Sequence, residues 1–318
     1  MTEQEVAPAP QPSAAASSSG LVLAGVTLVW MAAMLWSARA TITGRVDVEM
    51  EVTSTAYALP GAISASLITG STVALAALSL LGRRRETGAS TRFAIATGSG
   101  LIIGVLGALT IVTINTEGWL YAVVGGTVAA AATIGGALAG FRIPRVVTAI
   151  GWASVAVFLV GLVLNLFQGP LLDAFSSSQA QSRADASQWL SYGQGFLSGL
   201  AAGLIAYFVL RRARRRSDGL DVPWPLYGLA GAGAGLLLVI AEILTRTAGS
   251  RVLDLAGKVS ELELVVQQML SGARLNSALI VLFVGAITAT IAVGRTIAPA
   301  PDDAEEEGTP AAASREKP

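Results

Sequence analysis

Eight separate stretches of the sequence are long and apolar enough to cross a lipid bilayer, and they constrain the fold more than any other feature. A bilayer core needs about 20 mostly apolar residues per helix. The stretches lie at 20–38, 58–82, 93–114, 119–141, 146–168, 189–210, 225–247 and 273–294. Only 13% of the residues are charged, against about 25% in soluble domains. The sequence therefore predicts an all-α membrane protein, a bundle of about eight transmembrane helices in four hairpins with a small amphipathic outer cap.

The two ends of the chain differ from this membrane domain, which we place at 20–295. Residues 1–19 are mainly Pro, Ala, Ser and Gln, and residues 296–318 hold a run of acidic side chains among Ala and Pro. Neither segment can bury an apolar core, so we expect two disordered tails.

The distribution of basic residues predicts the orientation. Twelve basic residues lie at one end of the predicted spans, in short connections: Arg83, Arg84, Arg85, Arg92, Arg142, Arg145, Arg211, Arg212, Arg214, Arg215, Arg216 and Arg295. The other end holds seven: Arg39, Arg45, Arg183, Arg246, Arg251, Lys258 and Arg274. The positive-inside rule then predicts cytoplasmic N- and C-termini. Ala38-Arg39-Ala40 looks like a signal-peptidase site, but the chain before it has no basic residue, which favours an uncleaved anchor.

The residue types favour a bacterial plasma membrane and argue against several functions. Arginine outnumbers lysine nineteen to two and Ala and Gly abound, which is typical of a high-GC bacterial genome. The formal net charge is zero, so no nucleic-acid partner is expected. The chain has no cysteine or histidine, which excludes disulfides, Cys or His metal sites and imidazole bases. With no cofactor motif and no pair of intramembrane acids, we expect neither a cofactor nor an enzyme.

Polar side chains within the spans are the candidate substrate-binding residues, because such groups are costly in a bilayer and often functional. They are Glu242, Arg246, Asn165, Gln194 and Asn276, all near the predicted outer ends of their spans. Two interpretations stay open. The groups either converge on an outward-facing polar cavity, or Glu242 pairs with Arg246 along its own helix while the amides join neighbouring helices.

Three segments outside the spans are candidate partner surfaces. Residues 45–52 alternate charged and apolar side chains, which predicts either a β-strand or an amphipathic segment on the bilayer. Residues 250–270 predict a helix with one apolar stripe that covers the bundle, lies on the membrane or binds a partner. That stripe contains Val252, Leu255, Val259, Leu262 and Val266. The third segment is the cytoplasmic loop 211–216, rich in arginine.

Two functions follow as hypotheses. The first is a permease, or a permease subunit, that moves a small solute or lipid-like molecule. A similarity between 59–62 and 270–273, at the entries to the second and eighth spans, favours an internal repeat, which is common in transporters. The second is a non-catalytic scaffold or assembly subunit of a bacterial envelope complex, favoured by the scarcity of polar groups at the membrane midplane.

Overall fold

The computed structural model describes residues 14–43, 48–81, 88–114, 119–141, 143–175, 180–216 and 223–295. Eight helices in these ranges are long and apolar enough to span a membrane. They are α1 (Ala14–Thr43), α2 (Val48–Leu81), α3 (Ala89–Val112), α4 (Trp119–Ala139), α5 (Pro144–Leu166), α7 (Ala180–Arg216), α8 (Trp224–Thr247) and α10 (Glu261–Gly294). Two short helices, α6 (Gln168–Phe175) and α9 (Ser250–Val259), lie between them in sequence.

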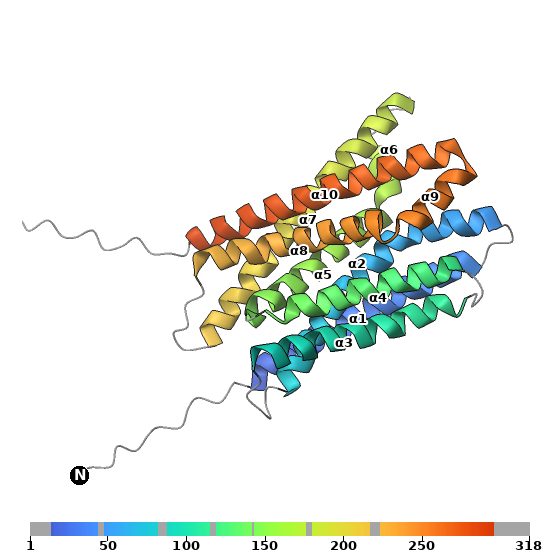
Figure 1. The fold of residues 1–318 in the computed structure, drawn as a ribbon. Helices are drawn as coiled ribbons and strands as arrows, with labels where there is room; N and C mark the ends of the chain where they lie inside the picture. Colours follow the sequence, from blue (N-terminus) through green and yellow to red (C-terminus); the bar gives the residue numbers. More distant parts are fainter. Residues whose placement is uncertain are drawn as a thin grey trace, which may run out of the picture.

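The eight long helices form the predicted membrane bundle of four hairpins. α1 packs on α2, α3 on α4, α5 on α7, and α8 on α10. Figure 1 shows these helices running roughly side by side, with connections at the two ends. We call the end that carries Arg145, Arg211 and Arg295 the basic end, and the end that carries Glu242 the opposite end. The protein is therefore an all-α, multi-pass membrane bundle.

Three predicted boundaries at the ends of spans need correction. The β-strand interpretation of 45–52 is wrong for residues 48–52, which begin α2, whereas 45–47 lie outside the described residues. A lone strand has no partner, whereas Thr55, Ala56 and Leu59 bury a helical face on the core. Residues 211–216 are the last turns of α7 and not a loop. α1 begins at Ala14, so 14–19 is helical, while 1–13 and 296–318 lie outside the described residues.

The predicted cap helix over 250–270 is also wrong as one continuous helix. Ser260 is extended, with φ −159° and ψ 141°, and it separates α9 from α10. Its side chain accepts a hydrogen bond from the Leu262 backbone N–H at 3.2 Å, which is the geometry of a helix N-cap. The predicted stripe is divided as a result. Val252 is fully buried against the core cluster, whereas Leu262 is 72% exposed.

The bundle consists of two halves that pack in the same way. In α1–α4, the first helix contacts the second and third, the second contacts the third and fourth, and the third contacts the fourth. The same five pairs occur when α5, α7, α8 and α10 are taken in that order. Because α5 is the fourth span after α1, an even number of crossings, the two halves have the same direction through the membrane. In Figure 1 α1 and α3 lie on one side of the bundle and α8 and α10 on the other.

Closely packed glycines show that this correspondence extends to individual residues. A Cβ at Gly100 of α3 would meet Ala132 and Gly136 of α4, and one at Gly231 of α8 would meet Gly285 and Ala289 of α10. The contacted residues of α4 and α10 are separated by the same number of positions in the sequence: 153 from Ala132 to Gly285, and 153 from Gly136 to Ala289. Small residues allow two helix backbones to approach closely, which stabilises helix pairs in lipid.

The repeat is therefore not the one expected from the sequence. Segments 59–62 and 270–273 belong to α2 and α10. In the packing of the two halves, however, α2 occupies the position equivalent to α7, and α4 the position equivalent to α10. A second glycine contact supports the new pairing. Gly70 of α2 lies against the Ala132 carbonyl oxygen, and Gly203 of α7 against the Gly285 carbonyl oxygen, again a difference of 153.

Candidate functional site

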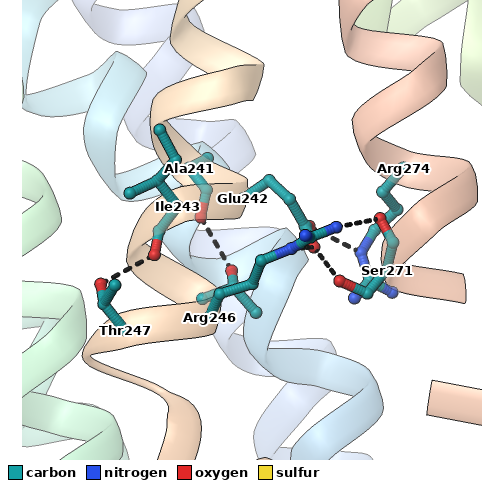
Figure 2. A network of polar contacts seen from close by, with 8 residues as sticks. Ala241, Glu242, Ile243, Arg246, Thr247, Ser271 and Arg274 are labelled. Carbon is teal, nitrogen blue, oxygen red and sulfur yellow. Dashed lines mark hydrogen bonds and ion pairs between the residues drawn. The ribbon is translucent and has the colours of Figure 1, made fainter. Parts of the chain in front are cut away.

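A cluster of charged side chains lies near the opposite end of the bundle, between α8 and α10. Glu242 is only 4% exposed, and its carboxylate lies between two guanidinium groups. Arg246 Nε is 3.0 Å from Glu242 Oε1, and Arg274 Nε is 2.9 Å from Glu242 Oε2. Ser271 Oγ also donates to Oε1, as Figure 2 shows. The group carries one negative and two positive charges, so it leaves one excess positive charge.

Helix geometry on both sides explains how these residues meet. Glu242 and Arg246 are four residues apart on α8, and residues at this spacing share one face of a helix. Ser271 and Arg274 are three residues apart on α10 and face the same cluster. Arg246 also donates through Nη2 to the Ser271 carbonyl oxygen at 2.9 Å, so the arginine joins the two helices.

Glu242 and Arg274 line one wall of a small cavity, which we call the charged cavity. Its volume is about 170 Å³, and its other walls include Pro60 and Ser64 of α2 and Ser277 of α10. Pro60 lies inside α2, where it has no backbone N–H to donate to the preceding turn. Ser64 Oγ donates to the Pro60 carbonyl oxygen at 2.9 Å. The charged cavity therefore combines a carboxylate, a guanidinium and serine hydroxyls.

A second cavity, the apolar chamber, has a volume of about 260 Å³. Trp30 and Met34 of α1, Phe158 of α5 and Leu238 of α8 line it, and the Trp30 and Phe158 ring centroids are 4.4 Å apart. Ser64 and Leu238 line both cavities. The two spaces are thus neighbours with a common wall between the halves of the bundle, with α1 and α2 on one side and α5, α8 and α10 on the other.

Two buried donors near these cavities have no hydrogen-bond partner among the described residues. They are Nη2 of Arg274 and the indole Nε1 of Trp30. A buried donor without a partner costs about 1–3 kcal/mol and more when it is charged. Such groups are rare in proteins, so each calls for an explanation.

The structure brings together only two of the five predicted substrate-binding residues, Glu242 and Arg246. Asn165 of α5 and Asn276 of α10 are exposed on the bundle surface. Gln194 of α7 faces α5, where its Nε2 lies 3.4 Å from the position of a Cβ at Gly161. None of these three amides lines the charged cavity or the apolar chamber.

Of the residues that line the two cavities, only Glu242 was predicted from the sequence, and those missed include Trp30, Ser64, Leu238 and Arg274. Only Arg274 carries a signal in the sequence, because it is an arginine inside the predicted span 273–294. The other three are ordinary residues of membrane helices, and their role depends on how distant helices pack.

The predicted partner surfaces occupy different environments. Val252 of α9 packs on the core cluster with Leu255 against it, so these residues cover the bundle. Val266 is half-buried on α10, and the side chain of Val259 lies outside the described set. At the basic end the Arg211 guanidinium lies 5.6 Å from the centre of the Tyr207 ring, a cation–π distance.

No protein-family model, curated protein or solved structure matches this chain. The fold and the composition nevertheless define its class. Eight apolar helices in one bundle make it a multi-pass integral membrane protein whose environment is a lipid bilayer.

Proposed function

We propose that the protein is a permease, or the membrane subunit of one, that moves a small solute or lipid-like molecule between its two halves. The observation that carries this proposal is that the charged cavity and the apolar chamber lie side by side, with Ser64 and Leu238 in the wall of both. Transporters are commonly built from repeats, with the substrate site at the interface between them. The unpartnered donor Arg274 Nη2 further favours a ligand at this interface.

The proposal includes an orientation and a location. We place the basic end in the cytoplasm, with both termini on that side, because Arg92, Arg145 and Arg211 follow the positive-inside rule there. The Glu242 cluster then opens toward the outer leaflet of a bacterial plasma membrane. We assign the protein no enzymatic step, since the described residues that line the two cavities supply binding groups and no pair of acid and base.

Thiol labelling tests whether water reaches this interface, and the natural chain has no cysteine to interfere. Ser64→Cys places a thiol in the shared wall of the two cavities. Ser66→Cys is the matched control, because Ser66 lies two residues along the same helix, is fully buried and lines neither cavity. We expect a membrane-impermeant methanethiosulfonate added outside to modify Ser64→Cys at least about tenfold faster. Equal, slow labelling of both variants would reject the permease proposal.

One observation favours the scaffold as a second candidate. Leu262 and Met269 lie two helical turns apart on α10, and both are more than 70% exposed at the opposite end of the bundle. If this apolar face binds a partner, Leu262→Asp with Met269→Asp should release a protein that co-purifies in mild detergent. The matched control is Gln268→Asp, at an exposed polar position between them on the same helix. Partner binding that survives the double substitution would contradict the scaffold.

A further inference from the structure

We propose that the charged cavity and the apolar chamber together bind an amphipathic anion with a single apolar chain. The carboxylate or phosphate head lies beside Arg274, and the chain extends into the chamber toward Trp30. This inference names the substrate class of the permease proposed above and rests on that function.

The charges of the cluster select an anion. Glu242 neutralises one of two guanidinium groups, so the cluster of Glu242, Arg246 and Arg274 keeps an excess positive charge next to the charged cavity, which Glu242 and Arg274 line. Both contacts to Glu242 are made through Nε, on one edge of each guanidinium. Guanidinium groups bind carboxylates and phosphates through paired, charge-assisted hydrogen bonds. The cluster is therefore arranged to accept a second anionic group.

Arg274 supplies the free donor for that group. Its Nη2 is buried and has no partner among the described residues, although the same side chain lines the charged cavity. Ser277 lies one turn further along α10 on the same wall and offers a hydroxyl. An oxygen of a bound carboxylate or phosphate would satisfy the Arg274 donor.

The apolar chamber fits the chain of such a molecule. Its volume of about 260 Å³ corresponds to roughly nine groups the size of a water molecule at about 30 Å³ each. A methylene group is of similar size, so the chamber has room for an alkyl chain of medium length. Trp30, Met34, Phe158 and Leu238 give it apolar walls.

The positions of the two cavities along α8 fix the orientation of the ligand. Glu242 lines the charged cavity, Leu238 lines both spaces, and Ala234 lines the chamber. Eight residues of α-helix, from 242 to 234, span about 12 Å. The head therefore lies near the opposite end and the chain points toward the membrane midplane, as a lipid of the outer leaflet does.

Photocrosslinking in lipid nanodiscs tests the assignment, with decanoate that carries a diazirine near its methyl end as the probe. We expect peptides containing Trp30 or Phe158 to be labelled. Arg274→Gln should reduce this labelling about tenfold or more, since it removes a charge-assisted hydrogen bond. Arg274→Lys keeps the charge and should retain most of it. Leu238→Trp places a larger side chain in the wall that the two cavities share and changes no charge. Because it would block the path of the chain, it should abolish the labelling as well.

Arg39→Gln is the matched control. Arg39 is another arginine near the opposite end, and it lines a lipid-facing groove of about 520 Å³ between α1 and α3. It already donates to the Thr110 carbonyl oxygen at 2.7 Å and to Thr113 Oγ1 at 3.0 Å. We expect Arg39→Gln to leave the labelling of Trp30 and Phe158 unchanged. Labelling of Leu106 in that groove instead, or loss of labelling only in Arg39→Gln, would overturn the assignment.

Competition with unlabelled compounds for the photocrosslinking site distinguishes a lipid headgroup from a free carboxylate as the bound anion. A monoacyl phosphate that displaces the probe better than decanoate points to a lipid headgroup, and the reverse order points to a free carboxylate. Decyltrimethylammonium has a similar chain and the opposite charge, so equal competition by this cation would overturn the proposal. Failure of the photocrosslinking with normal labelling of Ser64→Cys rejects only the anion, whereas failure at Ser64→Cys rejects the permease itself.

Discussion

Replacing Gly231 by alanine should destabilise the protein by about 3 kcal/mol, because a Cβ there would overlap the Gly285 carbonyl oxygen of α10. Overpacking of a close contact typically costs about 1–3 kcal/mol, and this contact involves two backbones that side-chain rotation cannot relieve. Unfolding in mixed micelles with increasing SDS, followed by tryptophan fluorescence, measures the change in free energy.

The equivalent position in the other half of the bundle should respond in the same way. Gly100→Ala should cause a similar loss, since Gly100 occupies the equivalent place on α3, where a Cβ would lie 2.5 Å from the Ala132 carbonyl oxygen. Gly98→Ala is the matched control on the same helix, because nothing lies within 4 Å of its Cβ position. It should leave the stability unchanged or raise it by about 0.5–1 kcal/mol through helix propensity. Equal stability of Gly98→Ala and Gly100→Ala would contradict the packing scheme.

Substituting Glu242 by glutamine should have the second large effect, on both stability and transport. It removes the carboxylate that faces Arg246 and Arg274 and leaves two positive groups close together. Breaking a fully buried ion pair costs about 3–5 kcal/mol. Arg246 and Arg274 are 42% and 31% exposed, so solvent screening reduces the expected loss to about 2 kcal/mol.

A double-mutant cycle isolates this effect. Glu242→Gln combined with Arg274→Gln should be more stable than Glu242→Gln alone, because the uncompensated charge of Arg274 is gone. Glu263→Gln is the control, an acid whose side chain contacts only Tyr57 and Gln267 among the described polar groups. Strictly additive losses at 242 and 274 would show that the cluster does not act as a unit. Unchanged transport in Glu242→Gln would remove the carboxylate from the permease mechanism.

The number of spans was predictable because the length of an apolar stretch is a local property of the chain. The break between α9 and α10 was missed although Ser260 and Glu263 form the Ser-x-x-Glu pattern of a helix start. The apolar stripe from 252 to 266 suggested continuity across that serine. At 48–52 the alternation of charged and apolar residues was too short to distinguish a strand from the first turns of α2.

The candidate site was predictable only where it is local. Glu242 and Arg246 are four residues apart, so their pairing follows from helix geometry. Arg274 and Ser64 come from other helices, and the sequence does not say which helices are neighbours. The direction of Asn165 and Asn276 was unpredictable for a further reason. Lipid-facing and buried faces of a membrane helix are both apolar, so hydrophobic periodicity does not reveal the buried side.

The central claim is that one position between the two halves is reached from both sides of the membrane. Labelling of Ser64→Cys in intact cells and in inside-out vesicles tests it most directly, with Ser66→Cys as the control in both. Alternating access of the halves predicts that the impermeant reagent modifies Ser64→Cys from either side and leaves Ser66→Cys unmodified. Modification of Ser64→Cys from the outer side alone would describe a fixed pocket and would contradict a permease.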